Sequence, residues 1–507
     1  MNTQRRAYDS AVEAFAFHWT SLLGVFVFAI AIWAQTNAMV GVFFDDGIYV
    51  QLAKSLAEGD GYRSMHLPDA PVAVHYPPAY PFVLSLWWRL WPSFPANVTL
   101  FEVWDAASLG LAATLIALHS RRAAMPAVMS ASALALAFIA FPLLTLVGVR
   151  FSESLFLLVA AGSVLVADSD DQSVRAAVLA GALAGVATLT RSIGVAVIGG
   201  VVLGMLVSGR RRNALLAGST GAVLLIPWLI FLVAHRDGVD PLLVSNYGTY
   251  GQFAGQAGIV GVLAGLDLRA FDPLRRLLLP AAPALVAWPL TGLLVAAFGA
   301  GAWSGFKKSP VLVATVVLYL GVVTLWPYTP DRFVWIALPW IAILMAMGGQ
   351  YAWSNGSVTR WGALLLLAAI AVGYGPREFR SLTTRGFANT ALAPSGQFVL
   401  LTTSISSALP ADAIVATDGE ALVHLYTGRR TVPVYLFELD GRDAVEFPTD
   451  STVAYWCRQS VTHVAASIPA ADIEPLFEAL ESHPAVELRP LFQVTAGPRL
   501  LEFTCQQ

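Results

Sequence analysis

Two adjacent carboxylates, Asp45 and Asp46, directly follow a long apolar run, in the stretch FFDDGIYVQLAKSLAEGDGYR of residues 43–63. An Asp is among the most costly side chains to hold near a bilayer. Two neighbouring carboxylates also raise each other's pKa unless a cation is close. Such a pair suits a general base, a metal ligand or a substrate clamp, and all three are kinds of functional site.

A structural role is the alternative for at least one of the two. The residues that follow predict an amphipathic helix that ends at Gly59. Its apolar face would hold Ile48, Tyr49, Leu52, Ala53 and Leu56, and its polar face Asp46, Lys54, Ser55 and Glu58. An Asp at the helix start caps free N–H groups, which is worth about 0.5–2 kcal/mol. One cap explains one Asp, and the second is left for another role.

The composition predicts the setting of this pair. Of the 507 residues 57% are hydrophobic and 12% are charged, whereas soluble domains run at about 45–50% and about 25%. The chain is therefore predicted to be a membrane protein with many spans. Its net charge of -3 gives no support to a nucleic-acid partner.

Eleven apolar stretches are each predicted to form a transmembrane helix. They cover about residues 19–40, 98–119, 125–148, 152–167, 176–190, 193–209, 213–234, 282–303, 310–327, 333–350 and 361–376. Two of them belong to one apolar segment, which the sequence TRSIG interrupts. An Arg at the centre of a span costs about 2.5–3.5 kcal/mol, so we expect a hairpin that turns at Arg191.

Lys and Arg clusters predict the orientation, because such residues collect in short cytoplasmic loops. With eleven spans, all four clusters fall on one side: Arg5/Arg6, Arg121/Arg122, Arg210/Arg211/Arg212 and Lys307/Lys308. We therefore expect a transmembrane domain over 1–376 with its N-terminus in the cytoplasm and an external loop over 41–97. A second external loop, 235–281, has a Gly-rich section that could close over a site. The tail over 377–507 is then an extracytoplasmic domain.

The tail alternates short apolar strands with helices, which predicts a small α/β domain. Strands are expected in AIVATD, TVPVY, THVAAS and RLLEFTC, and helices in GEALVHLYTG, ended by Gly428, and in ADIEPLFEALESH. Cys457 and Cys505 are the only cysteines. Outside the cytoplasm they could form a disulfide, or each could be an isolated apolar residue, and the sequence leaves both readings open.

Several segments, in this order along the chain, resemble the lipid-linked glycosyltransferases of the C type (GT-C). That family includes the bacterial lipid A aminoarabinose transferases and the protein O-mannosyltransferases. The similar segments are DDGIYVQLAKSLAEGDGY with HYPPAYPFVLSLWWRL, then RFSESLFLL, GALAGVATLTRSIG, YTPDRFVWIALPW and LPADAIVATDGEALVHLYTGRRTVPV. The resemblance implies the GT-C fold and an external α/β domain.

The resemblance also implies roles for single residues. Asp45 falls on the position of the catalytic Asp, and Asp46 and Glu153 on acidic positions that orient the acceptor or tune Asp45. The phosphate of the donor would be bound by Arg332, with Arg191 and His75 as further candidates, and we expect Tyr49 and Tyr76 to contact substrate. In one respect the sequence departs from the aminoarabinose transferases, which carry a Lys before the Pro, where this chain has Tyr76.

Each of these residues has a structural alternative. The alternatives are a helix cap for Asp46 and Glu153, an outer anchor or a partner of Asp331 for Arg332, a snorkelling side chain for Arg191 and a solvated loop residue for His75. Mg²⁺ or Mn²⁺ would fit among three carboxylates. We nevertheless expect no metal and no other cofactor, because the relatives most similar in these motifs work without one.

The activity implied is transfer of one sugar from a polyprenyl-phosphate to a glycan, lipid or protein acceptor on the extracytoplasmic side, with inversion at the anomeric carbon. The expected location is the plasma or inner membrane. A membrane transporter is one rival, and a ligase or polymerase that uses pyrophosphate-linked oligosaccharides is another. A receptor or structural role would leave the acidic residues without a function. The motifs do not specify the sugar, the acceptor, the carrier length or the oligomeric state.

Overall fold

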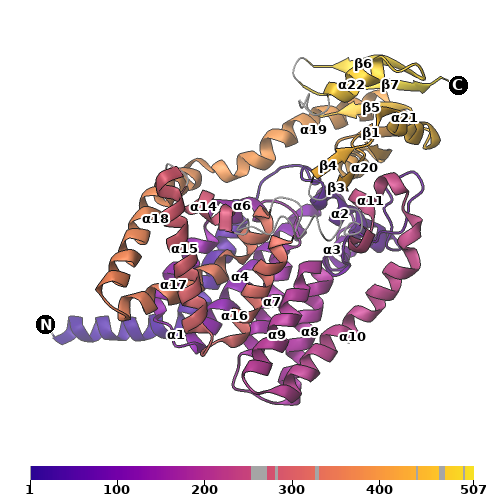
Figure 1. Cartoon of the computed structure of the whole chain (residues 1–507). Coiled ribbons are helices and arrows are strands. Elements are labelled where there is room, and N and C mark those ends of the chain that lie inside the picture. The colour runs from indigo at the N-terminus through magenta and orange to yellow at the C-terminus, as the bar shows by residue number, and fades with distance from the viewer. Residues whose placement is uncertain are drawn as a thin grey trace.

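A bundle of long helices carries a smaller α/β domain at one end (Figure 1). This computed structural model describes residues 2–252, 271–279, 284–325, 330–440, 443–467, 474–494 and 497–506. The bundle helices are α1 (Asn2–Ala34), α4 (Val98–Arg122), α5 (Ala127–Phe138), α6 (Phe141–Val147), α7 (Glu153–Ala167), α8 (Val174–Thr190), α9 (Val195–Val207), α10 (Arg211–His235), α15 (Ala284–Gly305), α16 (Pro310–Thr324), α17 (Asp331–Ser354) and α18 (Ser357–Thr384). Further helices are α2 (Asp45–Glu58), α3 (Ala79–Leu90), α11 (Val244–Tyr247), α14 (Asp272–Leu278) and α19 (Asn389–Ala408).

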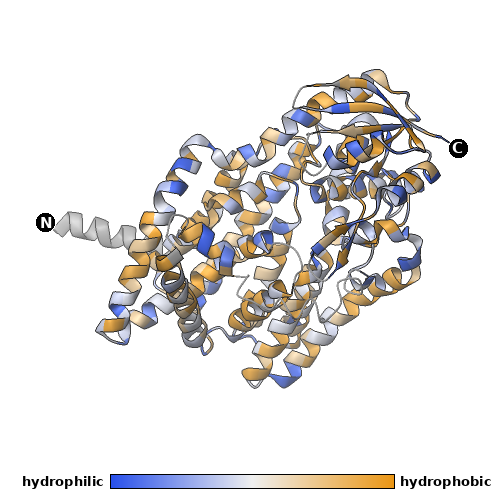
Figure 2. Ribbon diagram, turned by 45° about the horizontal axis from the view of Figure 1, so that its top comes forward, coloured by the Kyte–Doolittle hydropathy of each residue, from blue (hydrophilic) through white to orange (hydrophobic). Residues whose placement is uncertain are grey.

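The bundle is that of a multi-pass membrane protein, and each of the eleven predicted stretches forms helix over most of its described residues. Within the described residues, five helices are long and apolar enough to cross a bilayer, namely α4, α10, α15, α17 and α18, and α5 with α6 forms a sixth candidate. The other stretches form shorter apolar helices. Hydrophobic residues predominate along the bundle helices (Figure 2), and many large ones, such as Leu285 and Trp361, are exposed. The number of eleven crossings stays a prediction, as does the orientation.

The predicted hairpin at Arg191 is confirmed. Helix α8 ends at Thr190, and Arg191 is extended before the chain enters α9. Along α10, Gly218 lies near Val202 of α9 and Gly221 near Ile198. Since Gly181 of α8 lies near Ala217 and Gly185 near Leu224, α8 runs parallel to α10 and antiparallel to α9.

The predicted single helix over 125–148 is wrong, because the chain bends there by 59° between α5 and α6. Pro142 lies in the first turn of α6. Proline has no N–H for the ladder of a continuous helix, but it fits at the start of a new one. The bend brings the end of α6 towards the chain that leads into α7.

Small residues let the bundle helices approach closely. A Cβ on Gly301 of α15 would lie 1.8 Å from the Leu344 carbonyl oxygen of α17, and one on Gly348 would lie 1.9 Å from the Ala297 oxygen. Such small-residue contacts hold membrane helices together by van der Waals packing.

Helix α2 has its predicted length, and it ends at Gly59 in the left-handed conformation. Its predicted polar face is only partly correct, because Glu58 is exposed and Lys54 half-buried, whereas Asp46 and Ser55 are buried together with the apolar side chains. The reason is that α2 is covered on more than one side: it packs against α3 and also against α20 (Glu420–Thr427) of the α/β domain. The Gly-rich section of loop 235–281 covers residues 246–258, and the structure describes it as far as Gln252. Residues 253–258 lie outside the described residues, and closure of this loop over a site stays a prediction.

The α/β domain contains a five-stranded sheet in the order β2-β1-β5-β7-β6. Strands β1 (Ile414–Thr417), β2 (Arg430–Pro433) and β5 (His463–Ala466) are parallel, and β6 (Val486–Gln493) and β7 (Arg499–Cys505) add antiparallel pairs. The helices are α20, α21 (Thr449–Arg458) and α22 (Glu474–Glu481), and β3 (Phe437–Asp440) pairs with β4 (Asp443–Glu446) in a hairpin. The predicted βα alternation is thus confirmed for the parallel part, whereas β6, α21 and the hairpin were not predicted.

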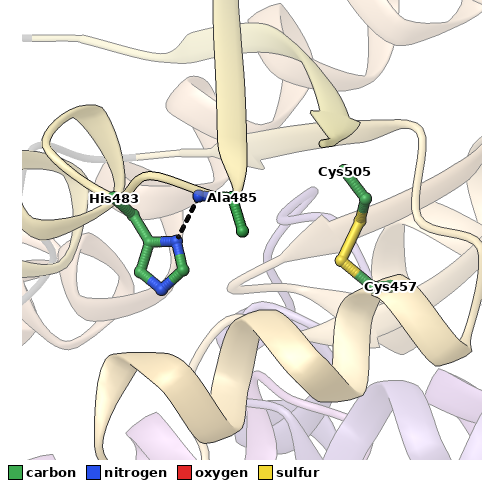
Figure 3. Close-up of a disulfide and its surroundings, with 4 residues drawn as sticks. All are labelled: Cys457, His483, Ala485 and Cys505. Carbon is green, nitrogen blue, oxygen red and sulfur yellow. Dashed lines mark hydrogen bonds between the residues drawn. A yellow bond between two sulfur atoms is a disulfide. The ribbon is translucent and has the colours of Figure 1, made fainter. Parts of the chain in front are cut away.

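A disulfide joins Cys457 of α21 to Cys505 at the end of β7 (Figure 3). Beside it, the His483 Nδ1 accepts a hydrogen bond from the Ala485 N–H in the turn after α22. The disulfide ties a helix on the sheet to the last strand of the chain. Of the two readings that the sequence left open, the paired one is correct.

The first turn of α20 makes the stability of this domain depend on pH. Burial raises the pKa of the Glu420 carboxyl from 4.5 to about 8. Between these values the folded state holds a proton that the unfolded chain has lost, so the Glu420 contribution to stability falls as the pH rises and is lost above 8. Glu420→Gln is therefore expected to raise the unfolding temperature relative to wild type by an amount that grows from pH 5 to pH 8.

Thermal unfolding in detergent at several pH values would test this. The control is Glu438→Gln, which changes an exposed Glu in the same domain. A Glu420→Gln difference that stays constant with pH would contradict the expected role of this carboxyl.

Candidate active site

The structure brings Asp45 together with Tyr76 and Arg332 at the end of the bundle that carries the α/β domain. The Asp45 Oδ1 accepts a hydrogen bond of 2.6 Å from the Tyr76 hydroxyl, and its Oδ2 accepts one of 2.6 Å from the Arg332 Nη1. Burial opposes ionisation, but the Arg332 charge and the Tyr76 hydroxyl outweigh it and hold the pKa of Asp45 below its usual range. The Asp45 side chain keeps 27% of its surface exposed. It is therefore an ionised carboxylate that a substrate can reach.

Glu153, the first residue of α7, lies on the other side of Arg332. Its Oε1 accepts hydrogen bonds from the Arg332 Nη2 at 2.8 Å and Nε at 3.1 Å. The same oxygen lies 2.7 Å from the Arg191 Nη1. Two guanidinium groups thus face two carboxylates, and the four charges of Asp45, Glu153, Arg191 and Arg332 balance.

Aromatic rings fix the planes of both guanidinium groups. The Arg332 guanidinium lies 3.7 Å from the centre of the Phe151 ring, and that of Arg191 lies 5.0 Å from the centre of the Phe333 ring. A cation over a ring face is attracted by the ring quadrupole. The Arg332 side chain is 29% exposed whereas that of Arg191 is 9% exposed, so Arg332 is the cation that an incoming anion reaches.

Tyr49 lies behind the site, which corrects its predicted role as a substrate contact. It is only 4% exposed, and its hydroxyl accepts a hydrogen bond of 3.1 Å from the Ser152 hydroxyl, which itself accepts one from Arg191. Its ring meets those of Tyr76 and Tyr80 edge-on at 5.0 Å and 5.2 Å. Tyr49 therefore supports the Tyr76 ring from inside.

Phe44 forms a tight turn immediately before Asp45. Its φ of 65° and ψ of -69° are those of a γ-turn, and the Asp45 N–H donates to the Phe43 carbonyl at 2.8 Å. This conformation costs on the order of 1–3 kcal/mol for a residue with a side chain. Since the surrounding structure must hold it, the turn is part of the means by which Asp45 is aimed at Arg332.

Asp46, the twin of Asp45, points away from the site and binds its own loop. Its Oδ2 accepts a hydrogen bond of 2.6 Å from the Gly41 N–H, and its Oδ1 one of 3.0 Å from the Phe43 N–H. The side chain is 2% exposed. The predicted catalytic role of Asp46 is therefore corrected to a structural one, in which the carboxylate closes the loop before α2 and also interacts with the Gly47 N–H in the first turn of that helix.

The Asp46 carboxylate is expected to set the acid limb of the pH–rate profile. Burial raises its pKa to about 6. Below this pH one oxygen carries a proton and no longer accepts from a loop N–H, at a cost of roughly tenfold in rate through the lost hydrogen bond. Turnover is expected to fall below about pH 6, which is above the range in which Asp45 takes up its proton. In Asp46→Asn the rate should be low already at pH 7 and flat across this range; a limb that persists in this variant would refute the assignment.

His75 is not placed as a phosphate-binding cation. Its Nδ1 is hydrogen-bonded at 2.8 Å to the Gly248 carbonyl, and its ring packs against those of Tyr76 and Tyr250. Burial lowers the pKa of His75, so the ring is neutral near pH 7. The sequence offered two interpretations of His75, a phosphate ligand and a solvated loop residue, and the structure supports neither. His75 is instead a packed residue whose ring contacts that of Tyr76.

An ionic cluster around Arg150 and an ion pair of Arg276, both beside the site, were not predicted. Arg150 is buried within 3.6 Å of Glu102 and 4.0 Å of Asp105, whose carboxylate also accepts from the Tyr80 hydroxyl. The signal for this cluster was two acidic residues one turn apart in an apolar helix, since such residues pair with a cation in membranes. The ion pair is that of Arg276 with Asp331 at 2.9 Å, which leaves Arg332 free of the partner that the sequence offered.

Among the described residues, no group of three or more His, Cys, Asp or Glu side chains is placed to hold a metal ion. The three carboxylates considered for a metal are separated, because Asp46 faces its loop and Arg332 stands between Asp45 and Glu153. The arrangement of Asp45, Glu153, Arg191 and Arg332 is a charge-balanced cluster in which Asp45 is the reachable carboxylate and Arg332 the reachable guanidinium.

Comparison with solved structures places this geometry on a known fold. The chain matches ArnT (aminoarabinose transferase) from Cupriavidus metallidurans bound to undecaprenyl phosphate, with a TM-score of 0.58 and 14% identity over 96% of this chain and 97% of that chain. For the apo state of the same enzyme the TM-score is 0.60 and the identity 16%, over 96% and 98%.

The oligosaccharyltransferase from Archaeoglobus fulgidus, tethered with an acceptor peptide, matches with a TM-score of 0.53 and 12% identity, over 97% of this chain and 74% of that chain. No protein-family model and no curated protein sequence matches the chain. The predicted GT-C fold, with its helical membrane domain and C-terminal sheet domain, is confirmed.

Proposed function

We propose that the protein is an inverting glycosyltransferase that moves one sugar from a polyprenyl-phosphate donor to an acceptor on the extracytoplasmic side of the membrane. The observation that carries the proposal is the reachable pair of Asp45 and Arg332, a base beside an anion-binding group. The fold supports it, because the solved structures that share it are glycosyltransferases, and two of them hold undecaprenyl phosphate and dolichol-phosphate.

Asp45 acts as the general base. The acceptor hydroxyl or amine gives its proton to the Asp45 carboxylate while its oxygen or nitrogen forms a bond to the anomeric carbon. The bond from that carbon to the phosphate oxygen breaks, and its electron pair leaves with the lipid phosphate. Such a single displacement inverts the anomeric centre. General-base help of this kind is worth about 10²–10⁴-fold in rate.

Arg332 receives the leaving phosphate. Its planar fork can bind phosphate oxygens in the way it now binds the Asp45 and Glu153 oxygens. When a phosphate draws the Arg332 Nη1 away from Asp45, the group that most lowers the pKa of this carboxyl is lost. Donor binding then makes Asp45 a stronger base at the moment when it is needed.

A single phosphate suits this site better than a pyrophosphate. Among the candidate phosphate ligands Arg332 is the reachable cation, since Arg191 is buried against Glu153 and His75 is neutral. Two phosphates would call for further cations. The rival transporter function is disfavoured because the charged network lies at one end of the bundle, next to the α/β domain, and not at the middle of the spans.

The orientation belongs to the same proposal. A disulfide is expected to form and persist outside the cytoplasm, and the α/β domain contains one. The disulfide therefore supports an extracytoplasmic location for the domain and the adjoining site, which in the proposal is the face of the plasma or inner membrane where the lipid-linked sugar meets the acceptor.

Purified protein in lipid, given labelled polyprenyl-phosphate sugars and the matching nucleotide sugars, tests the proposal. We expect turnover with a lipid-linked donor and none with a nucleotide sugar, and an acceptor product of inverted anomeric configuration by NMR. If the protein neither turns over nor binds any lipid-phosphate sugar, the proposal is overturned, and a transporter becomes the favoured function.

A further inference from the structure

The loop that leads into Asp45 rests directly on α20 of the α/β domain. Gly41 has a φ of +102°, and a Cβ built on it would lie 2.6 Å from the Leu422 Cβ and 2.9 Å from the Leu422 Cα. A Cβ on Gly47, in the first turn of α2, would lie 3.1 Å from the Ala421 Cβ. Two glycines of the membrane domain thus let the backbone of α20 approach on both sides of Asp45.

Hydrogen bonds to α19 and α20 also hold the 39–46 loop. The Val40 N–H donates to the Tyr426 hydroxyl of α20 at 3.1 Å, and the Met39 N–H donates to the Ser395 hydroxyl of α19 at 2.8 Å. Asp46 then closes the loop by accepting from the Gly41 N–H. The side chain of Leu422 is fully buried. The N–H groups of Met39, Val40 and Gly41 thus donate to α19, to α20 and to Asp46 respectively.

This support acts on a strained element. The γ-turn at Phe44 persists only while its surroundings prevent it from relaxing, and it sets the direction of the Asp45 side chain. The donor-binding group, Arg332, belongs to α17 and stacks on Phe151, and neither residue lies in this loop. The orientation of Asp45 therefore depends on the 39–46 loop, whereas phosphate binding by Arg332 depends on α17.

We propose that α20 is a positioning element of the active site, in which Leu422 and Tyr426 hold the 39–46 loop so that Asp45 is aimed at the acceptor. This inference deepens the proposed glycosyl transfer and rests on it for its kinetic readout. The α/β domain is then a working part of the catalytic unit, and its contact with the loop governs kcat.

The decisive comparison is Leu422→Ala against Leu480→Ala. Leu480 is equally buried but lies in α22, which packs on β6 and α21. Both variants remove the same γ and δ atoms from the same domain. Those of Leu422 belong to a buried cluster against which Met39 and Val42 of the loop pack, whereas the Cα and Cβ that face Gly41 stay in place. We expect Leu422→Ala to lower kcat by about 10- to 100-fold, the effect of a small misplacement of a reacting group, with unchanged donor Kd. Leu480→Ala is expected to keep kcat, and the near-isosteric Leu422→Met to restore it.

A second readout does not depend on activity. Hydrogen exchange of the 38–47 peptide, followed by mass spectrometry, is expected to become faster in Leu422→Ala and to stay slow in Leu480→Ala and Leu422→Met. Tyr426→Phe, which removes only the hydroxyl, should show a smaller change in the same direction and serves if Leu422→Ala does not fold.

The outcomes separate the two proposals. Faster exchange in Leu422→Ala supports the positioning role even when no donor is turned over, a result that would remove only the glycosyl transfer. Unchanged exchange and unchanged kcat in Leu422→Ala, or equal losses in Leu422→Ala and Leu480→Ala, would overturn the positioning role.

Discussion

Asp45→Asn is expected to lower the rate of sugar transfer by about 10²–10⁴-fold, the usual contribution of a general base. The amide cannot accept the proton of the acceptor, although it still fills the space between Tyr76 and Arg332. Donor affinity should be kept or rise, because Arg332 no longer has a carboxylate to leave before it binds phosphate. Transfer of a labelled sugar from a lipid-phosphate donor measures the rate, and binding of the same donor measures the affinity.

The matched control is Asp60→Asn, the same change at an exposed position just after α2. It should leave both quantities unaltered. Full activity in Asp45→Asn together with a large loss in Glu153→Gln would transfer the role of base to Glu153. Equal losses in both would show that the charge balance of the network, and not proton transfer by Asp45, is what the rate depends on.

Arg332→Gln is expected to reduce kcat by about 10²–10³-fold, as is typical when one preorganised group that stabilises developing charge is removed. The fold should survive, because Glu153 keeps Arg191 at 2.7 Å. Arg332→Lys keeps the positive charge but loses the planar guanidinium. A single ammonium cannot replace the Nη1 contact to Asp45 and the Nη2 and Nε contacts to Glu153. We therefore expect only partial recovery in the Lys variant.

The same substitution has a signature in the pH dependence. Arg332 lowers the pKa of Asp45, so its removal should raise that pKa. The further loss of activity that follows protonation of Asp45, below the roughly tenfold Asp46 step, should then begin at a higher pH than in wild type. Arg360→Lys, an exposed change on α18, is the control for handling of the membrane protein. A variant Arg332→Gln with normal kcat and weaker donor binding would mean that Arg332 holds the donor equally before and during the reaction.

The helical bundle and the α/β domain both position groups of the proposed active site. The bundle supplies Arg332, Glu153 and Arg191 from α17, α7 and the α8–α9 turn, and the α/β domain presses α20 on the loop of Asp45. Because the charged groups come from rigid helices, the distances between them are fixed by helix packing. Of the four charged residues, only Asp45 follows a strained turn, the one at Phe44, and this turn is supported by the α/β domain.

Much of this protein could be read from the sequence, because the relevant signals are local. The length and apolar character of a stretch predict a membrane helix without knowledge of its neighbours, and each of the eleven such stretches forms helix over most of its described residues. The stops of α2 at Gly59 and of α20 at Gly428 followed from the freedom of glycine to adopt positive φ. The sequence also marked Asp45 and Arg332 as chemistry-bearing residues.

What tertiary structure alone decided is the division of labour among those residues. Adjacent side chains on a helix point about 100° apart, so only the γ-turn at Phe44 and the packing of α20 determine that Asp45 faces Arg332 while Asp46 faces its own loop. Arg332 and Asp45 are 287 positions apart. Their contact, like the Cys457–Cys505 disulfide, depends on how distant segments pack, and no local pattern records that distance.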